Sequence, residues 1–124
     1  VVINTGAKAG RIVITYTDEV PAVAAGGAAG APIANNTVVV TQYSDTQGLT
    51  WSPKTYVRPA TLDHHWLPWL GVDTANGNCY VTWKETADQP TKNQSVRFCA
   101  ASTDGATWNA PLRISQGAAT PFGA

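Results

Sequence analysis

The sequence predicts an all-β fold made of two similar four-stranded antiparallel units, residues 1–61 and residues 62–124. Short runs rich in Val, Ile, Thr and aromatic residues alternate with turn residues along the chain, which is the pattern of strands joined by tight turns. A turn motif that ends in Thr-Trp occurs twice. No apolar pattern with a helical period persists long enough to compete. A self-contained β-sandwich is the alternative fold.

The first unit is expected to contain four strands, at residues 1–3, 11–17, 37–43 and 54–57. Residues 11–17 show the strand pattern best, because larger side chains occupy every second position. The segment from 18 to 36 is rich in Ala and Gly and contains two prolines. This composition predicts a long loop rather than a further element.

The second unit repeats this order, with strands expected at residues 69–72, 79–83, 95–100 and 112–114. The sequence Asn76-Gly77-Asn78 lies between the first two of these strands and is typical of a tight turn. Eight short strands joined in this way are expected to form two antiparallel sheets.

One motif turn follows the third strand of each unit. The first reads Ser44-Asp45-Thr46-Gln47-Gly48-Leu49-Thr50-Trp51, and the second reads Ala101-Ser102-Thr103-Asp104-Gly105-Ala106-Thr107-Trp108. The Gly, Thr and Trp recur 57 residues apart. Repetition at this spacing indicates tandem units, each of which cannot bury its own faces alone.

The motif turns resemble the Asp-box, or bacterial neuraminidase repeat, of sialidase-like β-propellers, whose pattern is Ser-x-Asp-x-Gly-x-Thr-Trp. Aligned on the Gly, Thr and Trp, neither turn has Asp in the family's position: Thr46 and Thr103 occupy it, while Asp45 lies one place early and Asp104 one place late. The resemblance implies that the two units are propeller blades. It also implies a structural role for the Asp-box residues, with both tryptophans packed between blades: Ser44, Gly48, Thr50, Trp51, Asp104, Gly105, Thr107 and Trp108.

A ligand site is expected at the end of the sheets opposite the motif turns. In a four-stranded meander, the turns after strands one and three lie at one end, and the other connections lie at the opposite end. In Asp-box propellers, the resemblance places ligands at that opposite end. The candidate ligand-binding residues there are Asp18, Glu19, Asp63, His64, His65, Trp66 and Glu85.

No metal ligand, cofactor or catalytic residue is assigned from the sequence. Adjacent side chains such as His64 and His65 point to opposite sides of an extended segment, so a shared metal is not expected. A glycosidase needs two carboxylates at a defined separation, whereas exposed carboxylates at strand ends usually serve solubility. Sialidases that resemble this repeat bind the substrate carboxylate with three arginines, but Arg11 lacks the flanking aromatic and Pro of the family motif. We therefore expect the arginines of this chain either to pair with carboxylates or to lie along the sheet with their charged ends in water.

Composition excludes several classes of function. The chain has eight basic and eight acidic residues, so it offers no electrostatic footprint for nucleic acid. No apolar run approaches the roughly 20 residues of a membrane span. Low charge with abundant Ala, Gly, Thr and Trp suits an extracellular or cell-surface β-protein. The chain lacks an amino-terminal Met and a signal-peptide pattern, so it is expected to be processed or cut from something longer.

Cys79 and Cys99 are the only cysteines, and they fall in neighbouring strands of the second unit. Antiparallel pairing centred near Gln89 would place them directly opposite each other, within reach of a disulfide. We expect this bridge to form, which would fit a secreted protein. Two reduced thiols are the alternative.

Two blades cannot close a ring, so their outer faces would expose apolar surface and strand edges. We expect either self-association, into a ring or a filament, or completion by the rest of a larger propeller. The functional hypothesis is an extracellular sialidase-like segment that presents a glycan-binding surface. The alternative is a structural or assembly protein that reuses the blades.

A third possibility is part of an exo-sialidase-like glycoside hydrolase, although this chain alone is not expected to be an enzyme. Exposed aromatic side chains at the loop end, which is the end of the sheets opposite the motif turns, would favour glycan binding. Aromatic side chains at the blade edges would favour assembly. Trp66 is the residue that distinguishes the two.

Overall fold

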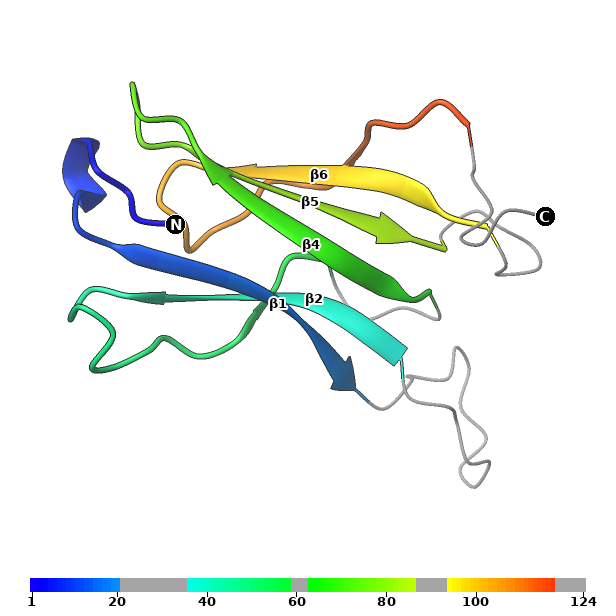
Figure 1. Cartoon of the computed structure of the whole chain (residues 1–124), viewed down its shortest axis with the longest axis horizontal. Helices are drawn as coiled ribbons and strands as arrows, with labels where there is room; N and C mark the ends of the chain where they lie inside the picture. The colour runs from blue at the N-terminus through cyan, green and yellow to red at the C-terminus, as the bar shows by residue number, and fades with distance from the viewer. Residues whose placement is uncertain (21–35, 59–62, 87–93, 118–124) are drawn as a thin grey trace.

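The computed structural model describes residues 1–20, 36–58, 63–86 and 94–117, and within them the fold is all-β with one short 3-10 turn, η1 (Gly6–Lys8). The strands form two antiparallel sheets, in the orders β1-β2-β3 and β4-β5-β6-β7, and neither sheet closes on itself (Figure 1). The all-β prediction is confirmed. The strands are β1 (Ile12–Val20), β2 (Asn36–Ser44), β3 (Thr55–Tyr56), β4 (His65–Val72), β5 (Cys79–Glu85), β6 (Val96–Ser102) and β7 (Leu112–Arg113).

The amino-terminal segment runs beside β1 without becoming a regular strand. Val2 makes a single antiparallel bridge with Ile12. Backbone hydrogen bonds from Ile3 to Arg11 and from Val13 to Val1 flank it. The other seven predicted strands are present, and each sheet follows the order of the chain.

β1 and β2 form a longer hairpin than the sequence predicts. Their pairing begins with Ile12 opposite Ser44 and continues to Val20 opposite Asn36. Asp18 and Glu19, which were expected in a loop, therefore belong to the strand. The remainder of that predicted loop, residues 21–35, lies outside the described residues.

The core lies between the two sheets, where β4 packs against both β1 and β2. Alternate residues of β5 and β6 point into this core, including Val81, Trp83, Phe98 and Ala100. The Trp83 and Phe98 rings stack with their centroids 6.0 Å apart. Val39 of β2 joins the same cluster from the first sheet. The intervening residues of β5 and β6 therefore point away from the first sheet.

The predicted disulfide between Cys79 and Cys99 is wrong, since both cysteines are free. Cys79 lies opposite Ser102, and Cys99 lies opposite Thr82. The register is displaced by three residues from the predicted one, and an odd displacement turns the two side chains to opposite faces of the sheet. Cys79 is buried in the core and Cys99 lies on the outer face. Burial raises the pKa of both thiols.

The two ends of the sheets carry different groups of residues (Figure 1). β2 and β6 end at Ser44 and Ser102, which begin the two motif turns, at one end. β4 begins at His65 and β5 ends at Glu85, directly opposite each other, at the other end. The motif turns and the predicted ligand-binding residues are therefore separated by the length of the strands, as expected.

Candidate functional site

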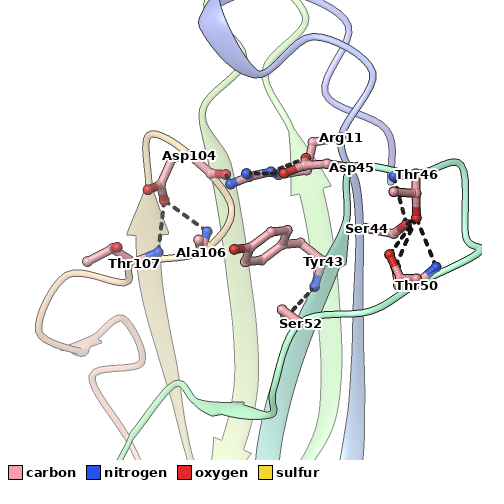
Figure 2. Close-up of polar contacts among 10 residues, drawn as sticks. All are labelled: Arg11, Tyr43, Ser44, Asp45, Thr46, Thr50, Ser52, Asp104, Ala106 and Thr107. Atoms are coloured by element: carbon pink, nitrogen blue, oxygen red, sulfur yellow. Dashed lines mark hydrogen bonds and ion pairs between the residues drawn. The ribbon is translucent and has the colours of Figure 1, made fainter.

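The first motif turn is closed by two hydroxyl groups. The buried Ser44 Oγ accepts hydrogen bonds from the Gly48 and Thr46 backbone N–H groups, at 2.9 and 3.2 Å. Thr46 Oγ1 accepts from the Thr50 N–H at 2.8 Å and lies 2.8 Å from Thr50 Oγ1 (Figure 2). Gly48 has a φ of +89°, a left-handed conformation that favours glycine. Thr46 thus closes the turn through its side chain.

The second motif turn is closed by a carboxylate. Ser102 Oγ accepts from the Gly105 N–H at 2.8 Å. Asp104 Oδ1 accepts from Ser102 Oγ at 2.9 Å. It also accepts from the Ala106 and Thr107 N–H groups at 2.8 Å each (Figure 2). Burial alone would raise the pKa of Asp104, but these hydrogen bonds and the nearby Arg11 outweigh it and lower the pKa.

Asp104 therefore has the same role in the second turn that Thr46 has in the first. The expectation that neither turn has Asp in this position is wrong for the second turn. Ser102, rather than Ala101, corresponds to Ser44, because Gly105 directly follows Asp104, whereas Gln47 separates Thr46 from Gly48. An alignment without a gap hid this relationship, although the Ser-x-Asp pattern at 102–104 was a signal for it.

Arg11 links the two motif turns. Its side chain is only 4% exposed. Nε and Nη2 donate to the two carboxylate oxygens of Asp45, at 2.7 and 2.6 Å, and Nη1 donates to the Asp104 carbonyl at 2.8 Å. The guanidinium also lies 3.9 Å from the centre of the Tyr43 ring, and Figure 2 shows it spanning the gap between the turns. The hydrogen bond from Arg11 lowers the pKa of Asp45.

A hollow of about 340 Å³ opens beside Arg11, between the η1 turn and the first motif turn. All three guanidinium nitrogens already have protein partners. The expectation that Arg11 pairs with a carboxylate is met by Asp45. Because its hydrogen bonds reach both motif turns, the Arg11 side chain has a structural role.

The two tryptophans of the motif turns differ in burial. Trp108 packs against both clusters of the core, and its Nε1 donates to Thr41 Oγ1 on β2 at 2.9 Å. It therefore lies between the sheets as predicted. Trp51 is 41% exposed, so its predicted packing between blades is not observed within the described residues and stays a prediction. Among the described residues, no strand forms a third sheet that could cover the Trp51 side chain.

The structure gathers part of the predicted ligand-binding set at the opposite end. The Thr86 N–H donates to the His64 carbonyl at 3.1 Å, and the Thr37 N–H lies 3.5 Å from His64 Nδ1. These contacts place His64 between the two sheets. Asp18 instead turns toward Lys54, at 2.7 Å, and this hydrogen bond lowers the pKa of Asp18.

Glu85 is fully buried and is held by two groups that sequence reasoning missed. Its Oε1 lies 2.9 Å from Nη1 of Arg58, and its Oε2 accepts a hydrogen bond from Trp83 Nε1 at 3.0 Å. The Arg58 guanidinium also lies over the Phe98 ring, 4.9 Å from its centre. A signal was available, because the period of two along β5 puts Glu85 on the same inward face as Trp83.

His65 is a buried neutral side chain. Burial lowers its pKa to about 4, and the positive charge of Arg58 acts in the same direction, while Asp63 opposes them. His65 Nε2 lies 3.6 Å from Glu85 Oε2, which is too long for a hydrogen bond. The nearby Glu85 carboxylate alone would favour the protonated form of His65, but that carboxylate already forms an ion pair with Arg58.

The predicted ligand set is therefore divided by the fold. His65 and Glu85 face the core, while Asp63, His64 and Trp66 remain partly exposed at or near the beginning of β4. Among the described residues, no group of three or more His, Cys, Asp and Glu side chains is placed to hold a metal ion. The described chain also contains no helix with the length and apolar character needed to cross a membrane.

Exposed apolar side chains gather instead on the outer face of the second sheet, which we define as the face directed away from the first sheet. Trp69 lies opposite Thr82 in the middle of β4 and is 76% exposed. A β-bulge separates it from Trp66, which lies opposite Lys84. Beside β7 is a hollow of about 330 Å³ whose lining includes Tyr80, Cys99, Ala101, Leu112 and Ile114.

No protein-family model matches this chain, and a search of curated proteins finds no match either.

Proposed function

We propose that this chain is an assembly unit: two consecutive blades of a sialidase-like β-propeller whose open sheet faces are covered by further blades. Two features support the propeller reading. Each sheet follows the order of the chain, and each carries a turn of the same design after its third extended segment. The contact between the sheets includes the Trp108 to Thr41 hydrogen bond, which ties the motif turn of one sheet to the neighbouring sheet.

The observation that carries the assembly role is the position of the exposed aromatic residues. Trp69 projects from the middle of β4, where it lies opposite Thr82, rather than from the loop end. Leu112 and Ile114 are exposed on the same outer face, at 68% and 48%. Soluble monomers rarely leave such apolar side chains together in water. Covering them contributes roughly 25 cal/mol for each Å² removed from water.

The solution mass of the chain tests this proposal. Light scattering coupled to size-exclusion chromatography at micromolar concentration should give a multiple of 13.0 kDa. Leu112→Asp should reduce the mass, because it places a charge on the outer face. Thr74→Asp adds the same charge in an exposed turn and should leave the mass unchanged. A folded species of single-chain mass at every concentration would contradict the proposal and favour a self-contained β-sandwich.

Glycan binding is the second candidate function. Trp66, Trp69 and Tyr80 lie on one face of the second sheet, and exposed aromatic rings can stack on sugar rings. Calorimetric titration with sialylated and neutral oligosaccharides tests this role. Binding that is lost in Trp69→Ala, with the solution mass unchanged, would support it. Heat of dilution alone from both sugars would exclude it at the concentrations used.

We propose no catalytic role, because the Glu85 carboxylate is buried and engaged by Arg58 and Trp83. An extracellular or cell-surface location belongs to the proposal and is supported by composition, since charged residues make up only 13% of the chain. The free thiols of Cys79 and Cys99 add no support to it.

A further inference from the structure

The contact between the two sheets shows how one sheet covers a face of the other. We use this contact as a template for what covers the remaining exposed face of each sheet. β2 and β6 end at equivalent serines, Ser44 and Ser102, so Thr41 in β2 corresponds to Cys99 in β6. The neighbouring strands agree with this match. Thr41 lies opposite Thr15 and Thr55, and Cys99 lies opposite Thr82 and Leu112.

In the template, a motif-turn tryptophan of one sheet covers the preceding sheet. Trp108 donates its indole N–H to Thr41 at 2.9 Å. It also packs on the clusters that contain Val13 and Val57. The first sheet thus presents a receiving surface, and the second sheet supplies the side chain that fills it.

The second sheet presents the equivalent receiving surface on its outer face, but nothing in the described chain fills it. The hollow of about 330 Å³ is lined there by the equivalent residues. The corresponding pairs, first sheet then second, are Val13 and Tyr80, Thr41 and Cys99, Tyr43 and Ala101, Thr55 and Leu112, and Val57 and Ile114.

The first sheet supplies the equivalent inserting side chain, and no sheet formed by the described residues receives it. Trp51 corresponds to Trp108 in the motif turn and is 41% exposed. Its turn is held in shape by the same serine-centred hydrogen bonds, so the indole is presented on an ordered turn. Within the described residues, the receiving surface of the second sheet is therefore unfilled, and Trp51 of the first sheet is not inserted into another sheet.

We propose that Trp51 of one copy inserts into the hollow of a second copy, with its indole N–H directed at Cys99 Sγ. This inference rests on the proposed assembly function and adds the partner, the contact residues and the polarity. The contact is head-to-tail, so repetition closes a ring or extends a filament. Equal numbers of acidic and basic residues leave the chain with no net charge to oppose association of copies.

Single substitutions test each side of this contact. Trp51→Ala removes the inserting side chain and should weaken association about 30-fold or more, as for a central aromatic anchor. Leu112→Asp should abolish insertion by charging the hollow. Cys99→Thr should strengthen association about five-fold, because a hydroxyl accepts an indole N–H better than a thiol. Leu49→Ala is the matched control, since Leu49 is 86% exposed on the same turn and the template has Ala106 there.

Mixing the variants tests the polarity. Trp51→Ala keeps the hollow, and Leu112→Asp keeps the tryptophan, so each alone should be monomeric while an equimolar mixture forms a 1:1 dimer that cannot extend. Light scattering on the two proteins and their mixture measures this. A mixture that stays monomeric would overturn the proposed contact. Wild-type association that Leu112→Asp weakens but Trp51→Ala does not would also overturn it while leaving the assembly function standing, whereas a monomeric wild type would overturn both.

Discussion

Arg11 and Asp45 form a two-pronged ion pair in which the cation is buried and the anion is exposed. The Nε–Oδ1 and Nη2–Oδ2 distances are 2.7 and 2.6 Å. The third nitrogen, Nη1, donates to the Asp104 carbonyl in the other motif turn. One side chain, placed immediately before β1, therefore fixes the turns of both sheets relative to each other.

Arg11→Lys should lower the free energy of unfolding by about 2 kcal/mol, because an ammonium cannot reproduce the planar fork that serves both turns. Urea denaturation followed by tryptophan fluorescence measures this. The control is Lys54→Ala, which breaks the exposed ion pair with Asp18 at a similar distance of 2.7 Å. Exposed ion pairs contribute little to stability. Equal losses in the free energy of unfolding in the two variants would therefore contradict the structural role of Arg11.

Asp104→Ala should lower the free energy of unfolding by about 2 kcal/mol, because three hydrogen bonds to Oδ1 are lost. Thr46→Asp should instead stabilise the first turn by a few tenths of a kcal/mol to about 1 kcal/mol, since a carboxylate accepts hydrogen bonds more strongly than a hydroxyl. The pKa of Asp104 lies below 3.8 in the folded chain. Its contribution is therefore complete above that pH and is lost as the pH falls through the folded pKa. Destabilisation by Thr46→Asp at pH 7 would show that the two turns are not equivalent.

The strands were predictable because period-two alternation and turn residues are local signals. β5 and β6, for example, were predicted from residues 79–83 and 95–100 and are observed at Cys79–Glu85 and Val96–Ser102. Their register was not predictable, because it depends on packing across the core. Placing Trp83 opposite Phe98 and burying Val81 sets the pairing, and a displacement of three residues then separates Cys79 from Cys99.

The candidate site was predicted in position but not in burial. Loop-end residues were expected from the meander topology alone, and His64, His65 and Glu85 do gather there. Their exposure depends on long-range partners, since Glu85 is held by Arg58 from beyond β3. The exposed outer face was inferred from the blade count, whereas the hollow beside Cys99 required the observed register.

Gly105→Ala and Gly10→Ala form a matched pair that separates steric from conformational cost. Both glycines have a positive φ, +69° and +93°. A Cβ at Gly105 would lie 2.5 Å from Val13 Cγ2, whereas nothing lies within 4 Å at Gly10. Gly10→Ala should cost about 1 kcal/mol, and Gly105→Ala about 1–3 kcal/mol more through overpacking. Thermal or urea unfolding measures both changes in the free energy of unfolding. Equal losses would mean that the core beside Val13 accommodates the added methyl group without cost.

His65 should make stability depend on pH between about 4 and 6.5. Burial lowers the pKa of His65 from 6.5 to about 4. Between these values the unfolded chain binds a proton that the folded chain does not, so the free energy of unfolding decreases as the pH falls through this window. The full effect of about 3 kcal/mol follows from the size of the pKa difference. Above pH 6.5 the imidazole is neutral in both states and contributes no pH dependence.

Urea denaturation at intervals from pH 7.5 to pH 4 measures this dependence in the wild type and in His65→Leu. The Leu variant should flatten the curve over the window, because it removes the group whose protonation differs between the folded and unfolded chains. The matched control is His64→Leu, the same substitution at the neighbouring, partly exposed side chain. The carboxylates with lowered pKa, Asp18, Asp45 and Asp104, act below 3.8 and so lie outside the window. A slope that survives in His65→Leu would show that burial of this imidazole is not its cause.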